Sequence, residues 1–504
     1  MTENKSIKYG AIISYVGIFL KLAISFLYTP WMIHKIGVSD YGLYSLILSF
    51  ISYFLMDFGL HQAIQRFIAK YRAGGDEDKV AKMVGLTTKV YLAIDAVIFL
   101  ILFVLYFFIS NIFKGLTPDE IERVKGLYLI AGTFSILNFM FKPMAGAMMA
   151  FEYFVEEKAL ELLNKVGAVL LVCIALSMGA DVYALVFING AIALFTSFAK
   201  YLVFKHKSKL KIQWSYFNRG ELKSVFSFSA WTFLISLSQR MRVTIVPTIL
   251  GILSNSTEIS IFALGITIEG ILYSFSYALN GLFLPKVSRM LHKEKSSEVN
   301  SLMIRVGRIQ LFIILLLFSG FVSFGPEFLN LWVGKQFAFV YFIVLCFIIP
   351  NTVLFTQSVA NDVVLVENKI KNTATMTLVS SAIGLAIACT LSPSMGAVGA
   401  AIGTGSGLVL NALWLNVFYK KVLDIDVKEF FKKSHLRIMP LIVVYSVVGN
   451  FIFSHLKIDT WFILVAVIGV YTLGYLAIVW FILANRYEKD LVLSLVKKKK
   501  TSNG

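Results

Sequence analysis

Charged residues are scarce in this chain, and several familiar catalytic motifs are missing. Only 15% of the 504 residues are Asp, Glu, Lys or Arg, whereas an ordinary soluble domain has about 25%. The sequence has no GxxxxGK[ST], GxSxG or HExxH pattern. These absences argue against a P-loop nucleotide site, a nucleophile elbow and a zinc-protease helix. We therefore expect no enzyme activity.

Cysteine and histidine are also rare. The three cysteines, Cys173, Cys346 and Cys389, each lie inside an apolar run and have neither a disulfide framework nor metal-ligand spacing. The six histidines form no HxxxH pair. The sequence therefore predicts no metal site and no cofactor.

Apolar residues are abundant, at 58% of the chain, and the mean hydropathy is +0.77. A membrane-spanning helix needs about 20 apolar residues to cross about 30 Å of hydrocarbon. We therefore expect an all-α integral membrane protein of about fourteen transmembrane helices. The predicted spans are roughly 9–33, 41–65, 88–110, 124–149, 160–178, 183–204, 224–252, 259–284, 302–324, 337–361, 372–392, 398–419, 437–454 and 460–484. The first apolar run is longer than a signal-peptide core, so we expect it to remain uncleaved.

The distribution of basic residues predicts the topology. The termini and even-numbered loops hold 37 of the 47 Lys and Arg residues, and the opposite side holds 6. Because Lys and Arg collect on the cytoplasmic side, both termini are predicted to be cytoplasmic. The bias also accounts for the net charge of +18 without nucleic-acid binding. The loops are too short to hold a soluble catalytic domain.

An internal repeat is visible at a spacing near 217 residues. The matched residues are Pro30 with Pro247, Gly179 with Gly396, and Gly190 with Gly407. The spacing covers six spans, so the two copies are predicted to be parallel. We expect a six-helix lobe at 1–210, a second at 211–425, and two additional helices with a basic tail at 426–504. Two such lobes are typical of transporters that bind substrate between them.

The first span of each repeat carries cations near the predicted membrane midplane. In span one, Lys21 shares a helical face with Ser14, Ser25 and Tyr28. Ionisable residues inside a span are costly and usually face an interior cavity. This pattern favours a cavity lined by Lys21. The structural alternative is a lysine that snorkels or pairs with a nearby carboxylate.

In span seven, Arg240 and Arg242 point about 160° apart on an ideal helix. Both can face one cavity only if the backbone deviates, which nearby Pro247 allows. Arg240 has the more polar stripe, but the repeat places Arg242 and Trp231 on the face equivalent to that of Lys21, so we favour Arg242. Such cations suit a phosphate or pyrophosphate, and pairing with a carboxylate is the alternative. The predicted substrate-binding residues are Lys21, Arg240, Arg242, Trp231 and Tyr28.

Acidic residues and a histidine also lie within predicted spans. Glu269 shares a stripe with Tyr273 in span eight, Asp57 and His61 are four residues apart in span two, and Asp95 lies in span three. Two roles remain open for Asp57, His61, Asp95 and Glu269. They could bind a coupling ion or act as counter-charges, or they could form ion pairs that hold the bundle together.

Three segments carry a family resemblance. They contain Pro30-Trp31-Met32-Ile33 with GVSDYGLY after it, DFGL with AIQRFIAKY at residues 57–71, and GAVGAA at residues 396–401. Together they resemble the polysaccharide (O-antigen type) flippases. This family is the oligosaccharide branch of the multidrug/oligosaccharidyl-lipid/polysaccharide exporter superfamily, and the resemblance covers nearly the whole chain.

The resemblance implies two six-helix lobes in a V, with two peripheral helices. It also implies export of an undecaprenyl-diphosphate-linked oligosaccharide across the cytoplasmic membrane, by alternating access coupled to H⁺ or Na⁺. The expected partners are the lipid-linked oligosaccharide, membrane lipids and a polysaccharide polymerase. The protein itself is expected to be a monomer.

Two features distinguish the chain from neighbouring branches. Ser39-Asp40-Tyr41-Gly42 stands where the lipid II flippase branch has a DAF-like segment, and the drug-extrusion branch has twelve spans. A multidrug/cation antiporter remains an alternative, disfavoured because a cationic cavity repels organic cations. A membrane glycosyltransferase or polymerase is another, disfavoured by the short charged loop Thr117–Lys125.

Overall fold

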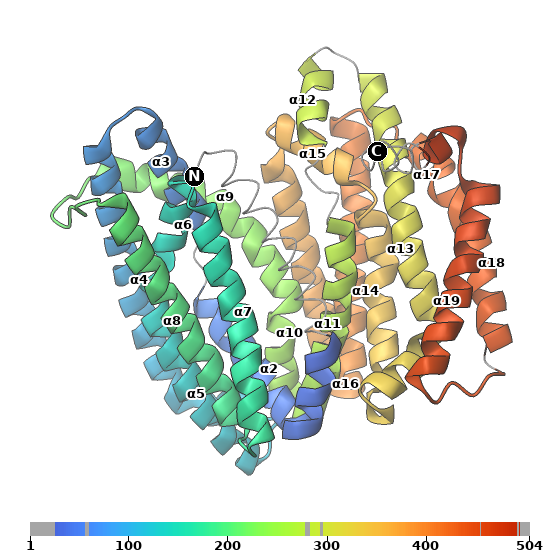
Figure 1. The fold of residues 1–504 in the computed structure, drawn as a ribbon, viewed down its shortest axis with the longest axis horizontal. Coiled ribbons are helices and arrows are strands. Elements are labelled where there is room, and N and C mark those ends of the chain that lie inside the picture. The colour runs from blue at the N-terminus through green and yellow to red at the C-terminus, as the bar shows by residue number, and fades with distance from the viewer. Residues whose placement is uncertain are drawn as a thin grey trace, which may run out of the picture. The chain divides into compact units, whose positions relative to one another are not determined.

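The computed structural model describes residues 26–55, 60–277, 283–292, 296–453, 455–490 and 493, and all regular secondary structure in these ranges is helical (Figure 1). The chain forms two compact units. Unit 1 contains Met1–Leu264 and Thr377–Gly403, and unit 2 contains Gly265–Met376 and Thr404–Gly504.

The helices of unit 1 begin with the helical residues 26–36. They continue as α2 (Val38–Phe54), α3 (Leu60–Ala73), α4 (Glu77–Ile112), α5 (Pro118–Phe139), α6 (Lys142–Ala150), α7 (Phe154–Ser177), α8 (Val182–Ser208), α9 (Arg219–Val243) and α10 (Ile245–Leu253). Within this unit α5 packs against both α4 and α8, and α7 packs against α8.

Two helices run through both units, α11 (Ser256–Tyr277) and α16 (Ile370–Val422). The other elements of unit 2 are α12 (Leu284–His292), α13 (Ser296–Trp332), η1 (Lys335–Phe337), α14 (Val340–Leu354), α15 (Ser358–Val366), α17 (Val427–Lys433), α18 (His435–Phe453), α19 (Trp461–Ile478) and the π-helical turn η2 (Val479–Leu483).

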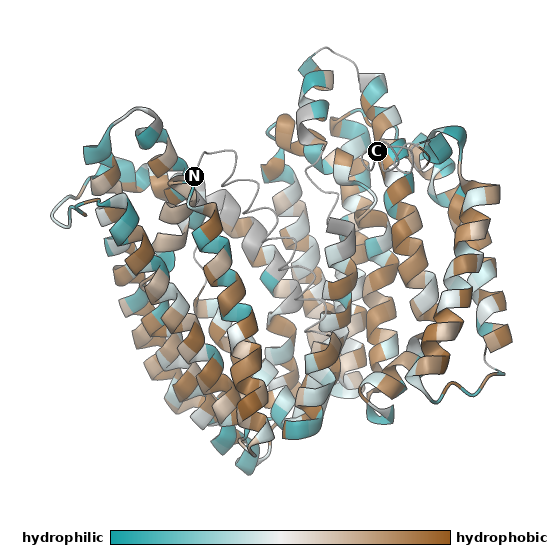
Figure 2. Cartoon of the chain, viewed as in Figure 1, coloured by the Kyte–Doolittle hydropathy of each residue, from teal (hydrophilic) through white to brown (hydrophobic). Residues whose placement is uncertain are grey.

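Nine of the described helical segments are long and apolar enough to cross a membrane, or ten if the bent pair α14 and α15 forms one span. Figure 2 shows apolar residues predominating along such helices as α4, α13 and α19. The described residues of the predicted spans from the second to the fourteenth are mainly helical, whereas most of the first span and parts of the second and eighth lie outside the described residues. The chain is therefore an all-α, multi-pass membrane protein, as predicted. The count of fourteen and the side on which the termini lie stay predictions.

Several predicted spans are interrupted. Span four comprises α5 and α6, and span seven comprises α9 and α10 with the break at Thr244. Pro247 contributes to that break, because it lacks the N–H that would bond the carbonyl four residues earlier. Spans eleven and twelve both lie within α16, which consists of two helices that meet at a kink at Gly396, where φ is +55°. Glycine adopts this left-handed conformation at little cost.

Side-chain caps fix the beginnings of several spans. The Thr117 hydroxyl accepts from the backbone N–H of Glu120, whose carboxylate accepts from the N–H of Thr117 in return. Asp181 caps α8 by accepting from the N–H groups of Tyr183 and Ala184. Such caps satisfy helix N–H groups that have no partner inside the helix. They therefore define where the chain enters these helices from the connecting loops.

Residues related by the repeat spacing are in direct contact within unit 1. The Ser256 hydroxyl lies 3.1 Å from that of Ser39, and these residues are 217 positions apart. Both hydroxyls donate to Oε1 of Glu120, at 2.5 Å from Ser256 and 2.8 Å from Ser39. At Gly42 an added Cβ would lie only 2.1 Å from the carbonyl oxygen of Ser256. The starts of α2 and α11 therefore pack closely at repeat-related positions.

In unit 2, a buried ion pair ties the C-terminal segment to α13. Arg308 donates to Oε1 of Glu488 at 2.6 Å and to Oε2 at 3.0 Å. The same guanidinium donates to the carbonyl oxygens of Lys433 and Leu483, each at 2.8 Å. Arg308 is 3% exposed and Glu488 6% exposed. These contacts satisfy the buried charges and anchor the region that follows the repeat.

Candidate functional site

Unit 1 contains a partly polar cavity with a volume of about 380 Å³. Five helices contribute to it: α3, α4, α5, α6 and α8. The polar lining residues are His61, Tyr91, Ser135, Asn138, Lys142, Ser197 and Lys200. The apolar ones are Leu55, Phe139, Phe141 and Ala145. We call this space the basic cavity because its lining contains two lysines and no carboxylate.

The break between α5 and α6 shapes one wall of the basic cavity. Pro143 occupies the first turn of α6, a position that tolerates proline because its N–H would lack a helical partner. The same proline cannot continue α5, since it lacks the donor for the carbonyl four residues earlier. A tight turn joins the helices, with the N–H of Phe141 donating to the carbonyl of Asn138 at 3.1 Å. The local sequence therefore places Lys142 at the cavity wall.

The two lysines have different surroundings. Lys142 donates to the backbone carbonyl of Leu55 and lies 4.7 Å from the centre of the Phe139 ring. Lys200 lies 3.2 Å from Oε1 of Glu157, and Lys158 lies 3.3 Å from the other oxygen of that carboxylate. Glu157 is therefore shared between two lysines. The cavity lining therefore presents two lysine ammonium groups that an anion could contact.

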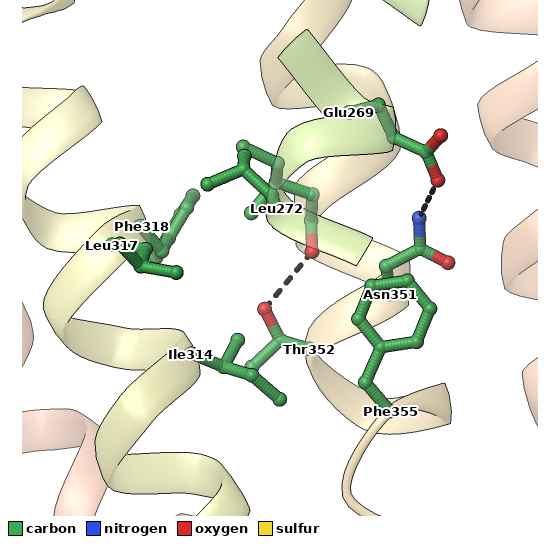
Figure 3. Close-up of a pocket in the computed structure, with 9 residues that line it drawn as sticks. Glu269, Leu272, Ile314, Leu317, Phe318, Asn351, Thr352 and Phe355 are labelled. Carbon is green, nitrogen blue, oxygen red and sulfur yellow. Dashed lines mark hydrogen bonds between the residues drawn. The ribbon is translucent and has the colours of Figure 1, made fainter. Parts of the chain in front are cut away.

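The second site is a small cavity in unit 2, with a volume of about 10 Å³ (Figure 3). Its polar lining residues are Glu269 on α11 and Asn351 and Thr352 on α14. The amide of Asn351 donates to Oε1 of Glu269 at 2.9 Å. The apolar lining residues are Leu272, Ile314, Leu317, Phe318, Ile348 and Phe355. We call this space the acidic cavity; it has room for about one water molecule.

The repeat relates the two cavities. Their linings share three pairs of residues that are 217 positions apart: Leu55 with Leu272, Ser135 with Thr352, and Asn138 with Phe355. The helices match as well, since the break between α5 and α6 corresponds to the break between α14 and α15. The latter pair bends by 57°. Interrupted helices at matching positions of two repeats are a mark of transporter binding sites.

The predicted substrate-binding residues do not line either cavity in the described structure. Lys21 lies outside the described residues, and the side chains of Trp231 and Arg242 are also outside them. Arg240 donates to the carbonyl of Ser52 at 2.7 Å. The Tyr28 ring lies 6.2 Å from that of Trp31. The role of all five residues in binding stays a prediction.

The predicted ion-coupling residues have separate locations. His61 lines the basic cavity and Glu269 lines the acidic one. Asp95, 8% exposed, lies one helical turn beyond Tyr91 on α4, near enough to Lys142 for electrostatic attraction. Asp57 lies outside the described residues. Whether these groups bind an ion or only balance charge also stays a prediction.

Four residues that line the cavities or carry a buried charge in the structure were not selected from the sequence. Lys142 falls within predicted span four without an assigned role, although the Lys-Pro pair in an apolar run marks the break. Lys200 falls near the end of predicted span six without an assigned role. Asn351 is neutral and gives no signal in a charge-based search. Asp362 follows the predicted end of span ten, yet in the structure it is 3% exposed within α15.

Comparison with known proteins gives a family and a fold. A family model described as polysaccharide biosynthesis protein matches residues 7–291, more than half of the chain. No curated protein matches the sequence.

The structure resembles a lipid II flippase MurJ in an inward closed conformation, with a TM-score of 0.71 and 13% identity over 96% of this chain and 99% of that one. It also resembles an inward-facing multidrug resistance MATE family transporter of the MOP superfamily, with a TM-score of 0.64 and 14% identity over 82% and 99% of the two chains. The Vibrio cholerae MATE transporter VcmN in its bent form gives a TM-score of 0.52 and 16% identity over 85% and 98%. The fold is therefore that of these membrane transporters.

Proposed function

We propose a transport function for this chain, which belongs to the polysaccharide biosynthesis protein family. In this proposal it moves an undecaprenyl-diphosphate-linked oligosaccharide from the cytoplasmic leaflet of the cytoplasmic membrane to the outer leaflet. The two predicted lobes alternate access to the two sides, driven by a cation gradient. The observation that carries the proposal is a basic cavity in a member of this family with a transporter fold.

The diphosphate is the natural ligand for the basic cavity. It is common to all such lipid-linked substrates, whatever their sugars. Lys142 and Lys200 provide two cations, and charge-assisted hydrogen bonds contribute about 1.5–3 kcal/mol each. Ser135, Asn138 and Ser197 add neutral groups that can bond to sugar hydroxyls or phosphate oxygens.

The ion pairs around the cavity allow Lys200 to change partners. When Lys200 turns from Glu157 to a diphosphate, Lys158 still neutralises that carboxylate. Binding the anion therefore does not leave a buried charge without a counter-ion, which would cost several kcal/mol. This arrangement permits reversible binding, as transport requires.

The predicted topology places the basic cavity toward the cytoplasm. Lys200 lies near the cytoplasmic end of predicted span six, and α6 leads into another predicted cytoplasmic loop. A substrate assembled on the cytoplasmic side would meet this cavity first. Lys21, Tyr28, Trp231, Arg240 and Arg242 remain proposed contacts at a later point of the transport path.

The test is glycan export in cells that lack the chromosomal copy of this gene. We expect Lys142→Glu to abolish export, since it places like charge against the diphosphate, and Lys142→Arg to retain part of it. Lys205→Glu makes the same change on α8 at an exposed position outside the cavity and should export normally. Membrane levels of each variant are measured in parallel. Parental export by Lys142→Glu at equal protein levels would refute the proposed site.

A multidrug/cation antiporter remains a second candidate, because two of the similar structures are MATE transporters. The basic cavity disfavours organic cations by like charge. The same strains distinguish the two functions. Loss of drug resistance without loss of glycan export would favour the antiporter.

A further inference from the structure

Asp362 is a buried carboxylate that has no counter-ion among the described residues. It is 3% exposed, and its Oδ2 accepts no hydrogen bond. No Lys, Arg or His nitrogen in the described chain lies within the 4.0 Å ion-pair limit of its carboxylate. It is therefore unlike Glu157 and Glu488, which lie beside cations.

Residues on either side of Asp362 have partners. Ser358 donates to Gln310 at 3.0 Å, and the amide of Gln357 donates to Asn416 at 2.7 Å. Asn361 accepts from the hydroxyl of Tyr419 at 2.9 Å. The other close neighbours on α15 are apolar and belong to one hydrophobic cluster with α12, α13, α16 and α17. Asp362 is thus an acid placed in an apolar core.

The charged groups of these neighbouring helices face elsewhere. Arg308 is bound to Glu488. Most of the remaining groups are exposed: Lys286, Arg289 and His292 on α12, Glu298 and Arg305 on α13, Lys371, Lys420 and Lys421 on α16, and Lys428, Glu429, Lys432 and Lys433 around α17. Glu327 on α13 is half-buried, and the buried His435 on α18 lies beside Thr356 and Ser434. None is within ion-pair distance of Asp362. Among the described residues, these helices therefore offer no charge that would stabilise an ionised carboxylate at this position.

An isolated ionised carboxylate is far more costly to bury than a neutral one, so such groups take up a proton or a cation. A metal cation needs several oxygen ligands. Around Asp362 most neighbouring side chains are apolar, and Ser358 and Asn361 have hydrogen-bond partners. Gln357 donates to Asn416, and its Oε1 is a buried oxygen without a partner among the described residues, which is fewer oxygen ligands than a metal cation needs. The surroundings therefore favour a proton over a sodium ion.

The repeat connects this acid with the substrate site. Ala145 lines the basic cavity in unit 1, and Asp362 lies 217 positions later. Both residues belong to the short helix that follows the matching break. One short helix thus brings Lys142 to a cavity, whereas the other carries Asp362 into a core.

We infer that Asp362 is a proton-binding site, and that its proton is the coupling ion of transport. The carboxyl holds the proton while α15 is packed as observed. When a conformational change brings water to α15, the O–H bond breaks and the proton passes to water. The reverse step forms the same bond from a proton delivered by the other side. The coupling role rests on the proposed function, whereas the protonation of Asp362 does not depend on it.

The first experiment measures protonation directly. The purified full-length protein is examined by infrared difference spectroscopy for the C=O stretch of a protonated carboxyl at neutral pH. We expect a band that Asp362→Asn removes and that Glu367→Gln leaves in place. Glu367 is a suitable control because it follows α15 and pairs with Lys369 at 2.6 Å. The absence of such a band in the parent protein would overturn the inference.

The second experiment measures coupling by glycan export. We expect Asp362→Asn, which mimics a permanently protonated carboxyl, to abolish export at normal membrane levels, and Asp362→Glu to restore part of it. Collapse of the proton gradient should also stop parental export, whereas replacement of external Na⁺ by K⁺ should not. Parental export by Asp362→Asn, or dependence on Na⁺, would overturn the coupling role. If Lys142→Glu exports normally while the band of Asp362 persists, the substrate site is wrong and the protonation stands.

Discussion

In unit 1 the break between α5 and α6 opens onto about 380 Å³ of space, whereas in unit 2 the equivalent break between α14 and α15 leaves about 10 Å³. The charges differ in the same places. The larger cavity is lined by lysines, and the smaller one by Glu269. The two repeats therefore share the position of the helix break but differ in the side chains that line it. The two cavities can therefore bind different ligands.

Particular residues fill the space in unit 2. Asn138 of the basic cavity corresponds to Phe355, whose ring packs 5.2 Å from that of Tyr273. Tyr91 corresponds to Arg308, 217 positions later, which binds Glu488 in the C-terminal segment. A larger side chain and a buried ion pair therefore stand where unit 1 has an opening. The segment after the repeat acts as a support for unit 2.

The strongest effect on stability should come from Arg308. We expect Arg308→Ala to lower the free energy of unfolding by about 3–5 kcal/mol, because it leaves the carboxylate of Glu488 buried without its partner. Thermal unfolding of the purified protein measures this change. Arg305→Ala is the matched control, since Arg305 is exposed and only lies over the ring of Tyr487 at 4.8 Å. Equal losses for the two variants would show that the C-terminal segment does not support unit 2 through this pair.

The hydrogen bond in the acidic cavity should contribute less. We expect Asn351→Leu to cost roughly 1.5–3 kcal/mol, because Glu269 loses a donor to a charged group. Ser274→Ala is the control, since the Ser274 hydroxyl donates to the backbone carbonyl of Gly270 in its own helix. The same thermal measurement compares them. If the two losses are alike, the contact with Glu269 adds nothing specific to unit 2.

The membrane class of the protein could be predicted from its composition, because repeated apolar runs of about 20 residues match the thickness of a bilayer. Helix breaks were harder to locate. Pro143 and Gly396 lie at their breaks and leave local signals, whereas the residues between Leu354 and Ser358 include no proline or glycine, and Pro350 lies one turn earlier within α14. The repeat spacing was readable from Gly179 and Gly396. It did not reveal that Asn138 would line an open cavity, whereas the matching Phe355 would fill the space in the other repeat.

Site residues were hidden for different reasons. Lys200 and Asp362 lie near predicted span ends, where sequence alone cannot separate a buried side chain from a loop. Their burial is set by neighbouring helices that are distant in the sequence, such as α7 for Lys200 and α13 for Asp362. The position of charged residues in the sequence was therefore not enough to identify the site residues. The positions of the helix breaks were also needed.

Transferring a residue from one cavity to the other tests whether the space matters. We expect Asn138→Phe, which copies Phe355 into unit 1, to fill part of the basic cavity and abolish glycan export. Its cost in stability should be modest, about 1–3 kcal/mol at most, since overpacking is limited where space exists. Asn138→Ala is the comparison, because it removes the amide and leaves the space. Export by Asn138→Phe at the parental rate would separate the cavity from transport.

The smallest effect is expected for Ser135→Thr, which copies Thr352 into the same wall. The change adds one methyl group and keeps the hydroxyl. In a packed core an added methyl group forces neighbours to move, but a cavity of about 380 Å³ can take it without strain. We expect a change of less than about 0.5 kcal/mol and normal glycan export.

The converse change, Thr352→Ser, removes a methyl group from a side chain that is 1% exposed. It should cost about 0.5–1.5 kcal/mol, as other single-methyl deletions in cores do. Thermal unfolding of both variants therefore compares the two walls with one methyl group. Equal and opposite changes would mean that the walls are packed alike, and the contrast between the cavities would then be lost.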